Sequence, residues 1–165
     1  TVDPQLVYGF GATLRYKMFD FGLFFSGVGK TYRILGGETW LPASSIGAGN
    51  IWSNIDSRWT EANPRQDVFW PRMSTTTYKN NEQPSTWWFK DMSFLRLKNI
   101  EVGVTLPEQW THAAKIRECR IFLRGNNILT FSKFNMWDPE IGSNDGLKYP
   151  VMKSVSLGVS FNFNN

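Results

Sequence analysis

Few residues in this chain combine in a pattern that supports chemistry. Two carboxylates, Asp138 and Glu140, lie two positions apart, and paired carboxylates serve glycoside hydrolysis or cation binding. The sequence holds one histidine, His112, and one cysteine, Cys119, too few for a histidine pair, a metal cluster or the usual nucleophile–base pair. The closely spaced glycines, Gly9 with Gly11 and Gly27 with Gly29, lie in strand patterns and not before a helix. They therefore predict no phosphate-binding loop. We therefore predict no catalytic residue, metal site or cofactor, and expect Asp138 and Glu140 to cap loop structure.

Tryptophan is the residue type that most favours a binding function. The chain has eight Trp, and 16% of its residues are aromatic. An indole offers a large flat contact area at low entropic cost, and loops held by a rigid scaffold often carry binding residues. These side chains would stack on sugar rings or grip a protein partner; the alternative is that they pack the loops onto themselves. The candidates are Trp40, Trp52, Trp59, Trp70, Trp87, Trp88 and Trp137.

The element that ends the chain has a hydrophobic period of two. In residues 151–163 large apolar side chains alternate with Ser, Gly and Asn, and Lys153 is the only polar residue in the apolar register. This period predicts a β-strand with two unlike faces. Soluble strands usually have about 5 to 6 residues, whereas a tilted strand that crosses a bilayer needs roughly 9 to 11. Length and alternation together are typical of an outer-membrane barrel strand.

The same pattern recurs in four earlier segments. We predict strands at about residues 6–17, 19–28, 93–106, 117–130 and 151–163. The first two form a hairpin, and the apolar face switches within the third, so we expect a bulge near Lys98 and Asn99. Arg15, Arg120 and Arg124 fall opposite the apolar register, where they would face a lumen or pair with neighbouring strands.

The links between these strands alternate in length. Links 17–18 and 107–115 are short, whereas links of about 29–91 and 132–150 are long, irregular and rich in Gly, Asn, Ser, Pro and Trp. Outer-membrane barrels have short periplasmic turns and long extracellular loops. The alternation therefore predicts an all-β, antiparallel transmembrane sheet with two extracellular loops and a periplasmic C-terminus.

Composition agrees with this fold and also with a soluble alternative. The mean hydropathy is -0.33, and no apolar run approaches the roughly 20 residues of a membrane helix. A soluble, aromatic-rich β-sandwich that binds carbohydrate would bury Val155, Leu157 and Val159 under a second sheet, whereas a barrel would turn them toward lipid. The net charge of +4 is scattered along the chain without an RNA-binding signature, so we predict no nucleic-acid partner.

Several separated motifs follow one another along essentially the whole chain. They are 8–14 (YGFGATL), 63–65 (NPR), 70–72 (WPR), 85–91 (STWWFKD), 94–103 (FLRLKNIEVG), 125–133 (GNNILTFSK), 137–140 (WDPE) and 161–163 (FNF). In this order and spacing they resemble the C-terminal part of a SusC/RagA-family TonB-dependent outer-membrane transporter. Several motifs at the family's spacing are harder to match by chance than one.

The resemblance implies a fold, a location and partners. The family forms 22-stranded transmembrane barrels, filled by an N-terminal plug, in the outer membrane of Gram-negative bacteria. It imports glycans or peptides with a SusD-like lipoprotein and with energy delivered by TonB and ExbB/ExbD. We expect this chain to supply about five C-terminal strands and outer loops, without the plug, as part of a longer polypeptide or of an assembly.

The resemblance also suggests roles for individual residues. Phe161 and Phe163 would form the signal that the barrel-assembly machinery reads, although Asn164 and Asn165 follow them; alternatively they are lipid-facing aromatics of the periplasmic girdle. The loop Trp residues would contact the lid lipoprotein or an oligosaccharide or peptide substrate. The three arginines of the polar register would contact plug carboxylates, and the apolar register would contact outer-membrane lipid.

Overall fold

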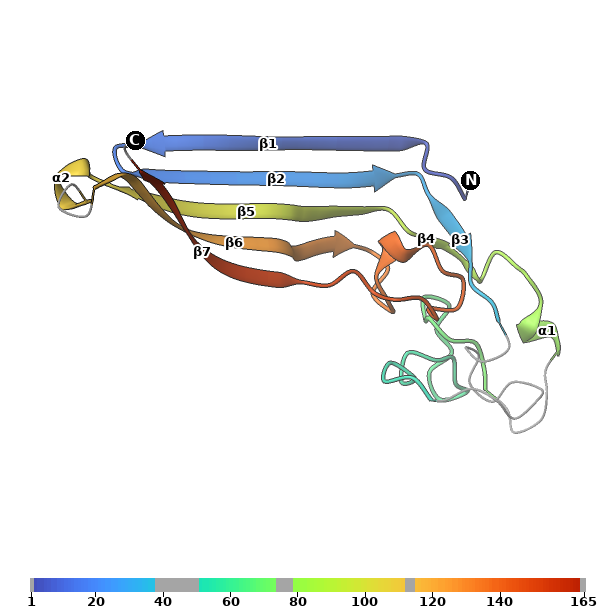
Figure 1. The fold of residues 1–165 in the computed structure, drawn as a ribbon. Coiled ribbons are helices and arrows are strands. Elements are labelled where there is room, and N and C mark those ends of the chain that lie inside the picture. The colour runs from blue at the N-terminus through green and yellow to red at the C-terminus, as the bar shows by residue number, and fades with distance from the viewer. Residues whose placement is uncertain (1, 38–50, 74–78, 112–114, 164–165) are drawn as a thin grey trace.

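The chain folds around a long antiparallel β-sheet. The computed structural model describes residues 2–37, 51–73, 79–111 and 115–163. Five strands lie in the order β1-β2-β5-β6-β7 (Figure 1). Their bounds are Leu6–Tyr16 (β1), Phe19–Gly29 (β2), Phe94–Leu106 (β5), Ile116–Ser132 (β6) and Ser154–Phe163 (β7). With 10 to 17 residues each, all of them reach the length that crosses a bilayer, roughly 9 to 11 residues.

The ends of the last two strands differ from the sequence prediction. β6 continues to Ser132, and β7 begins only at Ser154. The side-chain amide of Asn127 donates to the Met152 carbonyl oxygen at 3.1 Å. A side chain, and not the strand ladder, therefore holds the segment just before β7.

The links contain more regular structure than their composition predicted. Within the long link, β3 (Tyr32–Ile34) and β4 (Phe89–Asp91) form a small antiparallel sheet, in which the Tyr32 and Phe89 rings stack with centroids 4.9 Å apart. Three short helices complete the described elements: α1 (Lys79–Glu82), α2 (Glu108–Thr111) and the 3-10 helix η2 (Pro139–Ile141). No helix among the described residues is long and apolar enough to cross a membrane.

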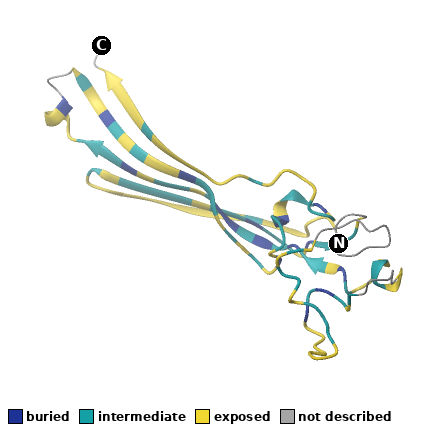
Figure 2. Ribbon diagram, turned by 90° about the horizontal axis from the view of Figure 1, so that it is seen from below, coloured by how far each residue is buried: buried dark blue, intermediate teal, exposed yellow. Residues whose placement is uncertain are grey.

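Strand register places large apolar side chains on one side of the sheet, here called the apolar face. Leu157 pairs with Leu123, and Leu123 with Val102. Val155, Leu157 and Val159 are 68%, 73% and 50% exposed, and β7 is exposed along nearly its whole length (Figure 2). The described residues form no second sheet over this face, so the β-sandwich alternative is wrong.

Two aromatic side chains interrupt the opposite side, here called the polar face. Phe24 lies over Gly11 of β1: a Cβ on that glycine would meet the ring at 3.2 Å. The Phe122 ring covers Gly158 of β7 in the same way, leaving no room for a Cβ there. Glycine in a strand can admit a close neighbour, and an aromatic ring that covers it restores the missing packing. This pairing explains why Phe24 breaks the alternation of β2.

The predicted bulge is present in β5. The pairing of β5 with β6 shifts register between Leu97 and Asn99, and the shift between β2 and β5 falls at the same place. On β6, Asn127 has a φ of 55°, a conformation that Asn adopts more readily than most residues. The extra residue, Lys98, returns Leu97 to the apolar face.

The two ends of the sheet carry different structures. The tight β1–β2 turn, α2 and the C-terminal end of β7 lie at one end (Figure 1). β3, β4, α1 and η2 gather with the long links at the other end (Figure 1). The sheet therefore has one plain end and one end that carries a folded loop cluster.

Candidate functional site

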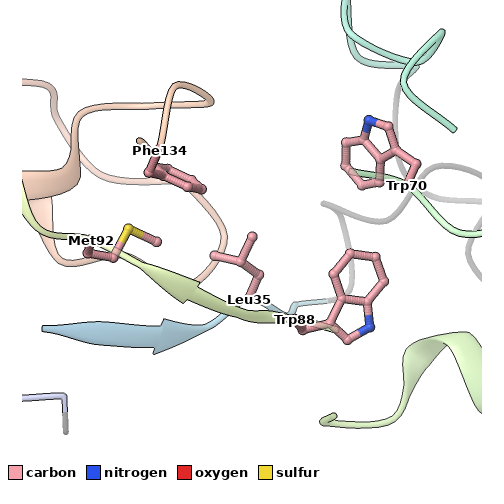
Figure 3. Close-up of a cluster of buried hydrophobic side chains, with 5 residues drawn as sticks. All are labelled: Leu35, Trp70, Trp88, Met92 and Phe134. Atoms are coloured by element: carbon pink, nitrogen blue, oxygen red, sulfur yellow. The ribbon is translucent and has the colours of Figure 1, made fainter. Parts of the chain in front are cut away.

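The two long links pack together around one hydrophobic core. Its buried side chains come from segments far apart in the sequence (Figure 3): Leu35, Trp70, Trp88, Met92 and Phe134. Backbone hydrogen bonds support the packing: Leu35 N donates to the Trp88 oxygen at 2.9 Å within the first link, and Gly36 N donates to the Asn144 oxygen of the second link at 3.1 Å. The two links thus pack into one structured loop cluster and are not two independent loops.

Two of the candidate tryptophans belong to this core. Trp70 is 1% exposed and Trp88 is 2% exposed, and their rings meet edge to face with centroids 6.3 Å apart. Trp70 Nε1 donates to Asn54 Oδ1 at 3.0 Å, and Trp88 Nε1 to the Asn81 carbonyl oxygen at 2.8 Å. The loop cluster itself surrounds both indoles and satisfies their polar groups.

The other described tryptophans among the candidates keep part of their side chains accessible. They are Trp52, Trp59, Trp87 and Trp137. Trp87 lines an open cavity of about 530 Å³ together with Pro71 and several amide side chains, among them Asn80 and Gln83. Trp40 lies outside the described residues. These four side chains therefore supply accessible indole surface in the described part of the loop cluster.

Two of the three candidate arginines are held in an ion network on the polar face. Arg120 of β6 reaches across β5 to the Asp20 carboxylate on β2, with Nε 3.0 Å from Oδ1, and also contacts Glu101 Oε1 at 2.6 Å. Arg124 Nε lies 2.5 Å from Glu101 Oε2. Gly103 makes the crossing possible, because a Cβ there would lie 2.5 Å from Arg120 Nη2.

Arg15 differs from the other two arginines. Among the described residues it has no ion pair, although it pairs along the ladder with Asp20. Arg15 and Arg120 line a cavity of about 240 Å³ near the β1–β2 turn, together with Glu118. Arg15 thus retains the capacity to bind a further carboxylate, whereas the pairs of Arg120 and Arg124 brace the sheet.

A second cluster of charges ties the loop after β6 to the polar face. The Arg96 side chain is 1% exposed and pairs with Asp138, and its Nε lies 3.3 Å from Glu140 Oε2. Lys98 Nζ contacts Glu140 Oε1 at 2.7 Å. Asp138 also caps η2, because its Oδ1 accepts from Glu140 N at 3.0 Å. The expected capping role is present for Asp138, whereas the Glu140 carboxylate pairs with Arg96 and Lys98. The sequence alone did not reveal Arg96 as the partner of both carboxylates.

Replacing Arg96 by methionine is expected to release this loop. Removing one partner of a buried pair leaves an uncompensated charge. Because the Asp138 side chain is 15% exposed, we expect the loss to lower the stability of the anchored loop by about 3 kcal/mol. Protease cleavage within residues 133–153 on intact cells should rise. The matched control, Lys98→Met, removes only a more exposed contact and should leave cleavage nearly unchanged. Equal cleavage of both variants and wild type would contradict the anchoring role.

Phe161 and Phe163 end β7 on the apolar face. They are 52% and 62% exposed, and their ring centroids lie 6.4 Å apart. Both lie at the end of β7 that pairs with the start of β6, where Phe161 is opposite Cys119 and Phe163 is opposite Ile116. This placement suits an aromatic girdle and an insertion signal equally well.

Comparison with known proteins identifies the origin of this arrangement. The chain is 30% identical over 177 residues to TonB-dependent receptor P3 of Formosa agariphila, an alignment that spans 97% of this chain and 16% of the relative. TonB-dependent receptor P26 of the same organism is 27% identical over 175 residues, spanning 97% and 17%. The chain is homologous to TonB-dependent receptors. It spans about a sixth of the length of these relatives, and no family model matches it.

Solved structures agree with this homology. The fold matches a chain of the RagAB peptide transporter with a TM-score of 0.78 and 25% identity, over 98% of this chain and 17% of that one. The RagAB peptide importer in its closed-closed state gives a TM-score of 0.76. TonB-dependent receptors are outer-membrane β-barrel transporters of Gram-negative bacteria and not enzymes. The antiparallel five-stranded sheet therefore matches part of a RagA-like barrel.

Proposed function

We propose that the whole protein is a TonB-dependent importer of the outer membrane and that this chain supplies its final barrel strands and outer loops. The observation that carries the proposal is the two-faced sheet: an uncovered face of Val, Leu and Phe backs a polar face that is braced by Asp20, Glu101, Arg120 and Arg124. Lipid on one side and a wet lumen on the other account for both faces. The edge strands β1 and β7 would pair with further strands that close the barrel.

The two ends of the sheet support an orientation for the proposed barrel. The plain end has the short connections of a periplasmic rim, and the loop cluster has the size of extracellular loops. The C-terminus would then lie in the periplasm, where Phe161 and Phe163 would be read by the barrel-assembly machinery. In this orientation Arg15 lies near the periplasmic end of the lumen, in a position to meet a carboxylate of the plug.

Peptides are the substrate class that the comparisons favour, because the RagAB proteins of similar fold are described as peptide importers. Glycans are the second candidate. The observation that favours them is the cavity lined by Trp87 and amide side chains, since indoles stack on sugar rings and amides bind hydroxyl groups. We propose that a SusD-like lipoprotein covers the loop cluster and that TonB with ExbB/ExbD delivers energy.

Growth of a strain that lacks the whole receptor tests this function. Supplied with oligopeptides as the only nitrogen source, the mutant should stop growing, and the complete gene should restore growth only in a strain with intact TonB. A parallel culture on glycan as the only carbon source decides between the substrate classes. Normal growth of the mutant on both sources would contradict the importer function.

A further inference from the structure

A third cavity lies where the two long links meet β4. It has a volume of about 420 Å³ and differs from the cavity next to Trp87. Residues of the first link, of β4 and of the segment after β6 line it, among them Phe69, Lys90, Lys133 and Asn135. Three segments far apart in the sequence thus build one site.

Lys90 is the central charged group of this cavity. Its side chain is partly buried, and its Nζ lies 4.8 Å from the centroid of the Phe69 ring, within the range of a cation–π contact. Burial lowers the pKa of the Lys90 ammonium. Among the described residues, no carboxylate forms an ion pair with Lys90.

The carboxylates that line the same cavity are engaged elsewhere. Asp67 Oδ2 pairs with Arg65 Nη2 at 2.6 Å, and Asp91 Oδ1 accepts from Ser93 N at 2.9 Å. Lys133 adds a second positive charge to the wall. The cavity wall thus contains a lysine that forms no ion pair with either carboxylate among the described residues, an aromatic ring and a second lysine.

We propose that this cavity binds a carboxylate group of the imported substrate, with Lys90 as its ion-pair partner and Phe69 as the apolar floor. The inference rests on the importer function proposed above and narrows its substrate class to acidic molecules. A ligand carboxylate would give the partly buried ammonium the ion-pair partner that it lacks among the described residues. The carboxylate comes either from a peptide or from an acidic sugar, since both present the same group to the lysine.

Binding to the whole receptor, purified with its lid, tests the proposal. The probes are an oligopeptide with a free C-terminal carboxylate, the same peptide as a C-terminal amide, an oligogalacturonate and a neutral maltooligosaccharide. Wild type should prefer the acidic member of at least one pair. In Lys90→Met the Kd of that acidic probe should rise about ten- to a hundredfold, the effect of losing one charge-assisted contact, while its neutral counterpart binds as before.

The matched control is Lys79→Met. Lys79 is an exposed lysine of α1 that does not line the cavity, so the variant removes the same charge from the loop cluster and should keep the wild-type preference. If Lys90→Met weakens binding of the acidic peptide, the carboxylate comes from a peptide. If it weakens binding of the oligogalacturonate, the carboxylate comes from a sugar.

Three results would overturn the inference, and they separate it from the importer function. Equal binding of acidic and neutral probes by wild type and Lys90→Met would remove the inference and leave the importer. If Lys90→Met no longer copurifies with its lid lipoprotein but still prefers the acidic probes, Lys90 contacts the lid and not the substrate. Binding of none of the four probes, combined with normal growth of the receptor-deficient strain, would remove the importer function as well.

Discussion

Replacing Leu157 by arginine should sharply reduce the amount of folded barrel in the outer membrane. Leu157 lies within β7, on the apolar face, and is 73% exposed. If that face meets lipid, an arginine near the bilayer midplane costs about 2 to 4 kcal/mol. The measurement is the fraction of receptor that migrates as the folded species on unheated SDS gels of outer membranes.

Thr13→Arg is the matched control on the other face. Thr13 pairs with Gly22 on the polar face of the β1–β2 hairpin, so the same added charge would enter the wet lumen, with Asp20 on the neighbouring strand. Its folded fraction should stay close to that of wild type. Equal losses in the two variants would contradict the assignment of the faces.

Replacing Trp70 by alanine should disorder the loop cluster while leaving the barrel inserted. The side chain is 1% exposed, packs against Phe69 with ring centroids 4.8 Å apart, and bonds Asn54. Truncating a buried aromatic costs about 3 to 5 kcal/mol. Protease added to intact cells should then cleave within residues 51–73 faster than in wild type, because this stretch loses its packing against the core.

Two companion variants separate packing from other causes. Trp70→Phe keeps most of the ring volume and loses the bond to Asn54, so its effect should fall to about 1 kcal/mol. Trp110 lies in α2, at the other end of the sheet, and is 69% exposed, so Trp110→Ala should leave the loop cleavage pattern unchanged. Wild-type resistance in Trp70→Ala would show that the loop cluster does not depend on this core.

The features that sequence predicts well here are local. The alternation within a strand fixes its two faces without knowledge of its neighbours, which is why the strands and the bulge at Lys98 were predictable from single segments. The apolar face of β7 was predictable for the same reason, because its side chains need no partner within the chain.

The features that sequence missed depend on pairings between distant residues. Asp20 and Arg120 are 100 positions apart and meet only because β5 places Gly103 between them. In the sequence, Trp70 and Trp88 could not be distinguished from the partly exposed Trp residues of the same loops. Only the packing of the two links shows that these two are buried. The β3–β4 pairing likewise joins short segments more than fifty residues apart. Alternation within three residues does not predict such a pairing.

Heat-modifiability tests the central claim most directly. Outer membranes from the source are run on SDS gels unheated and boiled, and probed with an antibody against residues 135–148 of the loop after β6. A band far above the 19.0 kDa of this chain that shifts on boiling is expected, because closed barrels resist SDS until heated. A soluble band near 19.0 kDa with no shift would contradict the assignment of this chain to a large outer-membrane barrel.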